Sequence, residues 1–231
     1  MTDTDFPGLP EALTGFLADL AANNEKAWMN AHRDAYEGDF LEPAKAFVAA
    51  MLPALGQVAP GLVGEPRVNG SIKRLNRDVR FSKDKRPYDP RLHVMFWHGA
   101  KPKESSGFHC VIGADWMAVG VGIWAFSPAQ LETYRQAVAG PAGAGLVEAV
   151  AKVEEAAGGG SLREPALKKV SSGFDADAPA AQLLRHKGLV MGQEGALAND
   201  LFSSVAVAHV VERFQRLAPL HGWLVTHVTG E

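Results

Sequence analysis

The sequence predicts an α+β fold, with a central antiparallel sheet and with N-terminal and C-terminal helices packed against it. Two patterns support this prediction. Apolar residues recur at helical spacing towards both ends of the chain, whereas residues 116–124 alternate with a period of two, as expected of a half-buried strand. The chain has 231 residues, of which 47% are hydrophobic, and this is enough to bury a sizeable core. We therefore expect one continuous domain, residues 1–231.

The N-terminal part is expected to form three helices. Apolar residues at helical spacing define the first, which ends at Asn23 and Asn24; these apolar residues are Leu13, Phe16, Leu17 and Leu20. The second helix contains Trp28. The third begins at Pro43, and Pro53 ends or kinks it because proline cannot donate the next helical hydrogen bond.

Three strands are expected in the middle of the chain, at residues 93–97, 108–112 and 116–124. A tight turn at residues 113–115 joins the last two into an antiparallel hairpin. The apolar residues of the third strand share one face; they are Met117, Val119, Val121 and Ile123. The opposite face is expected to be a flat platform on which a helix or a ligand lies close to the backbone, and it carries Trp116, Ala118, Gly120, Gly122 and Trp124.

Four further helices are expected after the strands. Ser127 followed by Pro128 is a strong helix start, because a capping hydroxyl precedes a proline at the first helical position. A second helix covers residues 142–157. A third begins at Asp177, and the last covers about residues 197–217.

The composition excludes several classes of protein. A single cysteine excludes an internal disulfide and a thiolate zinc cluster, and it is compatible with a reducing compartment. No apolar run approaches the roughly 20 residues that a bilayer span needs, and the N-terminus shows no secretory signal. We expect a cytoplasmic protein without a membrane partner. The sequence indicates neither a cofactor nor an oligomeric state.

The most informative feature is residues 73–86, called here the basic segment. Seven of its fourteen residues are basic: Lys73, Arg74, Arg77, Arg80, Lys83, Lys85 and Arg86. With Asp78 and Asp84 the segment carries a charge of +5, whereas the other 217 residues hold 16 basic and 24 acidic side chains. Such segregation in a mildly acidic protein points to a local anion site.

Eight residues in and beside the basic segment are candidate ligand-binding residues: Arg74, Arg77, Asp78, Arg80, Ser82, Lys83, Lys85 and Tyr88. The guanidinium groups of Arg77 and Arg80 would clamp a phosphate or carboxylate, and Tyr88 would stack or donate a hydrogen bond. The alternative is structural. Asp78 and Asp84 would then pair with arginines and brace a loop, because structural ion-pair networks resemble functional ones. The sequence leaves both interpretations open.

Other residues that could carry chemistry give weaker signals. Asp175 and Asp177 lie two apart in a turn and are weak candidates for a metal site, although such a pair is more often a turn residue and a helix N-cap. The histidines show no spacing typical of a metal site. His109 and Cys110 are neighbours on a predicted strand and point to opposite faces, so they are poor partners for nucleophilic catalysis. We expect Cys110 to be a small buried hydrophobic residue.

Four separated motifs together resemble a known family. They are Asn23-Asn24 followed by Trp28, the block from Arg74 to Tyr88, Gly120-x-Gly122-x-Trp124, and Gly173-Phe174-Asp175-x-Asp177-x-Pro179. Over about residues 6–224 the chain resembles domain-of-unknown-function family 2461. The resemblance implies one continuous α+β domain, and it brings no established activity, cofactor or partner.

The match to the family pattern also bears on the candidate site. It supports six positions of the basic segment and its surroundings: Arg77, Asp78, Arg80, Ser82, Lys85 and Tyr88. It raises the expectation that Asp175 and Asp177 face the same site. The chain departs from the pattern after Tyr88, where Asp89 stands in place of the usual lysine.

Three functions are compatible with these observations. The first is a site that binds a small anionic molecule bearing phosphate or carboxylate, with or without turning it over. The second is a metal-dependent phosphoester hydrolase in which Asp175, Asp177 and Asp78 hold a divalent ion. The third is a non-catalytic interaction module whose basic segment meets an acidic partner or nucleic acid. Nucleic acid is less favoured, because the net charge of −3 and the pI of about 6.2 argue against a broad basic face.

Overall fold

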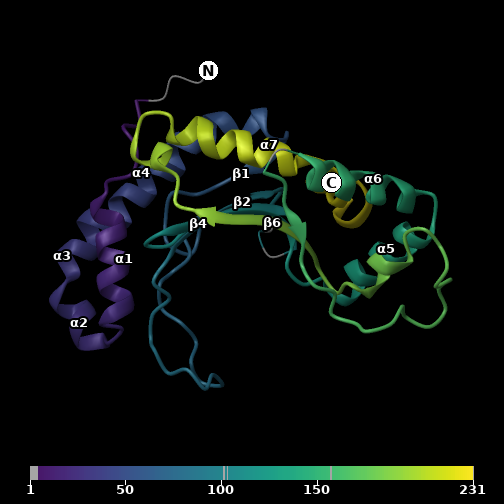
Figure 1. The fold of residues 1–231 in the computed structure, drawn as a ribbon, viewed down its shortest axis with the longest axis horizontal. Helices are drawn as coiled ribbons and strands as arrows, with labels where there is room; N and C mark the ends of the chain where they lie inside the picture. The colour runs from purple at the N-terminus through teal and green to yellow at the C-terminus, as the bar shows by residue number, and fades with distance from the viewer. Residues whose placement is uncertain (1–4, 101, 103, 157, 231) are drawn as a thin grey trace.

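The computed structural model describes residues 5–100, 102, 104–156 and 158–230. Its centre is a six-stranded antiparallel sheet with the strand order β1-β2-β3-β4-β6-β5 (Figure 1). The strands are β1 (Leu62–Val63), β2 (Leu92–His98), β3 (Gly107–Ile112), β4 (Trp116–Ile123), β5 (Ser161–Leu162) and β6 (Leu189–Ala196). Helices precede and follow these strands, so the α+β prediction is confirmed.

The three predicted strands are confirmed as β2, β3 and β4. The hairpin between β3 and β4 is closed by the Gly113 amide, which donates to the Trp116 carbonyl at 2.9 Å. From there the register pairs Ile112 with Met117 and continues to the far end of both strands. Because side chains alternate between the two faces, this register places the apolar set of each strand on the same side of the sheet.

That apolar side of the sheet packs against α7 (Ala206–Leu224). The Phe214 ring of α7 lies 6.2 Å from the ring of Phe96 and 5.0 Å from that of Phe108, and all three side chains are fully buried. Figure 1 shows α7 lying across this face. No described helix of similar length covers the opposite side, called here the open face; its partly exposed residues include His93, Met95, His109, Ala118 and Gly120.

The N-terminal helices form a separate arm beside the sheet (Figure 1). They are α1 (Ala12–Ala22), α2 (Lys26–Ala31), α3 (Arg33–Ala35), the π-helix η1 (Tyr36–Leu41), α4 (Glu42–Met51) and the 3-10 helix η2 (Leu52–Gln57). Phe16 holds the arm together, because its ring packs within 6.3 Å of the rings of both Tyr36 and Phe40. The α-helix that contains Pro43 ends at Met51, and Pro53 lies in the 3-10 turn that follows, as predicted.

Two more helices, α5 (Pro128–Ala139) and α6 (Ala142–Glu155), lie near the chain end, which forms the π-helix η5 (Val225–Thr229). Ser127 caps α5 as predicted: its hydroxyl accepts from the Gln130 amide at 3.2 Å, and the Gln130 side chain accepts from the Ser127 amide at 3.1 Å. The Trp223 indole donates to the Ala142 carbonyl and so joins α7 to α6. Residue 157, the predicted end of α6, lies outside the described residues.

The prediction of a helix that begins at Asp177 is wrong. The chain forms only the 3-10 helix η3 (Ala181–Arg185). Asp177 does not cap a helix, since its amide donates to the Asp175 carboxylate at 2.9 Å within a turn. His186 is already extended, because the chain must enter β6 three residues later.

The bounds of the last helix are also wrong. The segment from residue 197 begins with the 3-10 helix η4 (Asn199–Phe202), and α7 starts only at Ala206. It then continues past Leu217 and through Pro219, because Leu220 and Leu224 are buried on the core side. The strand β6 was not predicted, since its two glycines and its glutamate are residues that strands disfavour. No described helix combines the length and apolarity that a bilayer crossing requires.

Gly122 provides a test of the sheet geometry. Its φ is +138°, and a Cβ at this position would collide with the Leu189 carbonyl oxygen of the neighbouring strand. We expect Gly122→Ala to lower the free energy of unfolding by at least about 1 kcal/mol, measured by urea denaturation. Gly195→Ala, at an open position of the same sheet, is the control and should stay within about 0.5 kcal/mol of wild type. Equal effects of the two substitutions would contradict the described packing of β4 against β6.

Candidate functional site

A polar pocket of about 410 Å³ lies where the basic segment leaves the sheet. It is lined by Asn69, Lys73, Arg74, Asn76, Arg77, Asp78 and Asp89. Three of these residues, Arg74, Arg77 and Asp78, were candidate ligand-binding residues from the sequence. The structure therefore brings part of the predicted site together around one cavity.

The two carboxylates of the pocket are each neutralised by a neighbouring arginine. Asp78 accepts two hydrogen bonds from Arg80, at 2.9 Å from Nε and 2.7 Å from Nη2, and these bonds hold the pKa of Asp78 below its usual value. Asp89 accepts from Arg91 in the same way, at 2.6 and 2.8 Å. Both carboxylates of the pocket are thus already paired with arginines of the same chain.

The side chains of Lys73 and Arg74 differ from that of Arg77, the third basic residue that lines the pocket. Both side chains are exposed, and within the described part of the chain neither forms a hydrogen bond or a salt bridge. The charge of Arg74 contributes to the lowered pKa of Asp78. These two groups are therefore available to an anion in the pocket.

Arg77 mainly braces the basic segment. Its Nη1 donates to Asp84 at 2.9 Å and to the Arg86 carbonyl at 3.0 Å. Asp84 also accepts two bonds from Arg86, which with the Arg77 bond lower the pKa of its carboxyl far below the usual range. These contacts agree with the second interpretation of the sequence, in which Asp78 and Asp84 pair with arginines and brace a loop.

The tip of the basic segment projects away from the sheet (Figure 1). It is held in shape by Lys85, whose ammonium donates to the Val79 carbonyl at 3.0 Å, and by the Ser82 amide, which donates to the same carbonyl at 3.3 Å. Phe81 at this tip is 95% exposed, and the Arg80 guanidinium lies 5.7 Å from the centre of its ring. Lys83 is exposed beside it.

Tyr88 ends the basic region and is buried. Its side chain is 7% exposed and belongs to the hydrophobic core, so it is not placed to stack on a ligand in the pocket. Its backbone is held by the buried side chain of Asn24, which accepts from the Tyr88 amide and donates to the Tyr88 carbonyl, both at 3.0 Å. Asn24 therefore fixes the base of the basic segment to the N-terminal helices.

A histidine pair on the open face lies next to Lys73. His93 Nε2 and His109 Nδ1 are 2.8 Å apart, and the Lys73 amide donates to the His93 carbonyl at 2.9 Å. Burial, and then the charges of His109, Lys73 and Arg91, lower the pKa of His93 to about 3; burial and Lys73 lower that of His109 to about 4. Both imidazoles are neutral at pH 7, with one ring donating to the other.

This pair was missed in the sequence because the two residues lie sixteen positions apart and are diagonal neighbours across β2 and β3. The register pairs His93 with Val111 and Met95 with His109. The only available signal was that both histidines occupy positions of the same face in strands that were predicted to pair. Cys110, as expected, is fully buried, and burial raises the pKa of its thiol to about 12.

Asp175 and Asp177 do not join the pocket. The segment between β5 and η3 that contains them lies at the opposite end of the sheet from the basic segment (Figure 1). Both side chains are exposed, and the Asp175 carboxylate accepts from the Asp177 amide. No cluster of three or more metal-ligating side chains occurs among the residues that were searched, which are the described ones.

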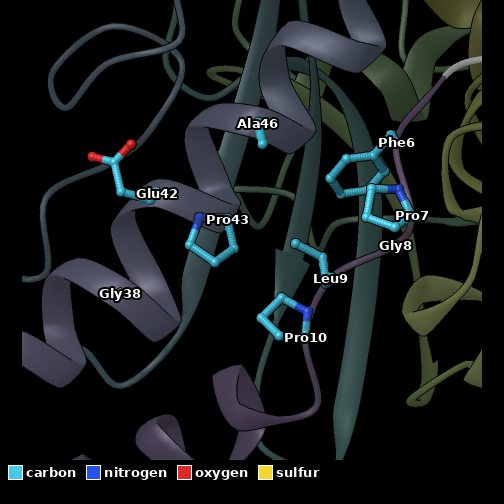
Figure 2. Close-up of a pocket in the computed structure, with 9 residues that line it drawn as sticks. All are labelled: Phe6, Pro7, Gly8, Leu9, Pro10, Gly38, Glu42, Pro43 and Ala46. Carbon is cyan, nitrogen blue, oxygen red and sulfur yellow. The ribbon is translucent and has the colours of Figure 1, made fainter.

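A second pocket, of about 650 Å³, lies between the chain start and the helical arm (Figure 2). Its walls are mainly apolar, with Phe6, Leu9 and Pro43 among the lining residues. The one ionisable group in it, Glu42, accepts from Lys45 at 2.7 Å. This pocket therefore offers an anion no cationic partner.

The Asn24 clamp can be tested by substitution. Asn24→Ala removes both hydrogen bonds and leaves the buried amide and carbonyl of Tyr88 unpaired, so we expect a loss of about 2–4 kcal/mol in the free energy of unfolding, measured by urea denaturation. Asn23→Ala is the matched control, because the Asn23 side chain bonds only to an exposed carbonyl at the end of α1. A loss no larger than that of the control would show that Asn24 does not hold the basic segment.

The histidine pair predicts a pH dependence of stability. The unfolded chain has histidine pKa values of about 6.5, above those in the folded state, so it takes up protons first on acidification. The free energy of unfolding should therefore fall between pH 7 and pH 5, by up to about 1.4 kcal/mol per pH unit for each histidine. In His93→Gln/His109→Gln this slope, measured by urea denaturation at each pH, should be flatter, whereas the exposed His32→Gln control should match wild type. A double variant with the wild-type slope would refute the assignment.

Comparison with known proteins gives one result. The family model described as a conserved hypothetical protein, DUF2461, matches residues 12–223. No curated protein matches the chain. The matched range includes the sheet, the basic segment and most of α7. The chain therefore belongs to the DUF2461 family of conserved hypothetical proteins.

Proposed function

We propose that the protein binds a small phosphate- or carboxylate-bearing molecule in the pocket at the base of the basic segment. One observation carries this proposal. The side chains of Lys73 and Arg74 line the pocket without a hydrogen bond or salt bridge to any described residue, whereas both carboxylates of the pocket are paired with arginines. The pocket thus has an excess of positive charge that an anion would neutralise.

The lining of the pocket suits an oxyanion. Arg74 presents a planar guanidinium that can donate two parallel hydrogen bonds to a phosphate or carboxylate, and Lys73 adds a compact charge. Asn69 and Asn76 supply neutral side-chain amides to the same cavity. A volume of about 410 Å³ falls in the range of small-molecule sites. These features favour a small ligand over a macromolecule at this position.

The residues proposed to contact the anion are Lys73 and Arg74, and they differ from the pair that the sequence suggested as a clamp. The sequence suggested a clamp formed by Arg77 and Arg80, but Arg80 is paired with Asp78 and one nitrogen of Arg77 is paired with Asp84. Lys73 and Arg74 therefore become the main anion-binding residues of the proposal. Arg77 also lines the pocket, and its hydrogen bonds to Asp84 and to the Arg86 carbonyl both come from Nη1. Ser82, Lys83 and Lys85 lie further along the segment and are not among the pocket residues.

The geometry gives no support to a metal-dependent hydrolase, because the segment between β5 and η3, which contains Asp175 and Asp177, lies at the far end of the sheet from the basic segment. A cytoplasmic location is part of the proposal. It is supported by the single, buried cysteine, which suits a reducing compartment.

Anion binding can be tested by thermal shift. We expect sulfate, phosphate or small phosphorylated and carboxylated compounds to raise the melting temperature of wild type, since a ligand at 100 times its dissociation constant adds about 2.7 kcal/mol of stability. Sodium chloride at matched ionic strength corrects for screening. In Lys73→Ala/Arg74→Ala the shift should be largely lost, while the melting temperature without ligand should change little because both side chains are exposed and have no described ion-pair partner.

The matched control is Lys168→Ala/Lys169→Ala, which removes two adjacent exposed cations in the segment between β5 and η3. It should retain the full shift. If both double variants lost the shift equally, the effect would reflect net charge, and a shift retained in Lys73→Ala/Arg74→Ala would refute the proposed site.

A further inference from the structure

Phe81 is the most exposed large apolar side chain in the described part of the chain. It is 95% exposed, compared with 69% for Trp124, which is covered on one face by the Arg163 guanidinium at 3.8 Å. A fully exposed phenylalanine forgoes the stabilisation that burial of such a side chain provides. Phe81 lies outside the anion pocket, so the proposed function does not account for it.

The protein presents Phe81 on a preformed support. Arg80 is fixed by its two bonds to Asp78, and Lys85 and the Ser82 amide both bond to the Val79 carbonyl. These contacts close the tip of the basic segment without using the phenyl ring. A loop held in this way loses less backbone conformational entropy when a partner binds.

Cations flank the exposed ring along the chain, with Arg80 before it and Lys83, Lys85 and Arg86 after it. Lys83 is exposed and has no side-chain hydrogen bond or salt bridge to a described residue, and Lys85 uses one of its three donors internally. Arg86 is exposed as well, although its charge is shared with Asp84. Arg80 approaches the ring at 5.7 Å from the centroid, so a planar group has room on the opposite face. The tip thus joins an aromatic surface to a positive field.

We propose that the tip of the basic segment binds single-stranded nucleic acid, with a base stacked on Phe81 and neighbouring phosphates held by Lys83, Lys85 and Arg86. Aromatic side chains combined with a positive surface bind single strands in many proteins without sequence preference. This interaction is separate from the small-molecule pocket and uses different residues.

The shape of the tip favours a single strand over other anionic partners. A single strand offers an accessible planar base beside every phosphate, which matches a protruding ring between cations. A duplex keeps its bases stacked within the helix. Binding to a lipid surface requires a larger apolar area than one phenyl ring supplies. An acidic protein would need a cavity that receives the ring, and the charges around it would then lose water.

The test is fluorescence anisotropy with a labelled 20-nucleotide oligothymidine. Phe81→Leu keeps an apolar side chain of similar size but removes the aromatic face, whereas Phe81→Tyr keeps that face. We expect Phe81→Leu to weaken binding about tenfold or more and Phe81→Tyr to stay within about threefold of wild type. Lys83→Gln should lower the slope of log affinity against log salt concentration by about 0.7. Val205→Ala, which truncates another exposed apolar side chain, should bind as wild type does.

Each other outcome overturns the proposal. Wild type that does not bind the oligonucleotide, or that binds it as tightly after Phe81→Leu, excludes base stacking at the tip. Binding to vesicles containing 30% anionic lipid, without binding to the oligonucleotide, would assign the tip to a membrane surface instead. The sulfate-induced thermal shift is measured on Phe81→Leu in parallel; its retention shows that the variant is folded and that the pocket is a separate site.

Discussion

The packing of α7 against one face of the sheet determines where everything else in this protein can lie. Phe96, Phe108 and Phe214 interlock at this contact, and the period-two alternation of the strands then assigns every residue of β2, β3 and β4 to one side or the other. Polar side chains such as His93 and His109 are therefore confined to the open face. The basic segment begins next to β2, because Ile72, the residue before it, forms an isolated antiparallel bridge with Val94 of that strand.

The charges of the basic segment serve two purposes, and the contacts separate them. Arg77, Arg80 and Arg86 are paired with Asp78 or Asp84 and give the segment its shape. Exposed pairs of this kind add little to stability, because solvent screens them, so their main effect is conformational. Lys73, Arg74 and Lys83 take no part in these pairs. The formal charge of +5 already subtracts Asp78 and Asp84, and these three side chains supply +3 of it.

The sequence predicted the parts of the structure that depend on local pattern. The alternation in residues 116–124, the turn at residues 113–115 and the cap at Ser127 all act over a few residues, and all are found in the structure. Prediction from the sequence failed where tertiary contacts override local conformational preference. The glycines of β6 become a strand only because β4 supplies its hydrogen-bond partners. The histidine pair depends on the register of two strands, and the burial of Tyr88 depends on Asn24, so neither could be predicted from spacing alone.

The Asn24 clamp also bears on how the protein folds. It joins residues that are 64 positions apart, and the intervening chain contains the helical arm from α2 to η2 and the edge strand β1. The entropy of closing so long a loop must be recovered by other contacts before two hydrogen bonds can form. We therefore expect Asn24 to reach Tyr88 after the arm has formed and β2 has joined the sheet. On this order of events, the basic segment acquires its position late in folding, once the core beneath it is complete.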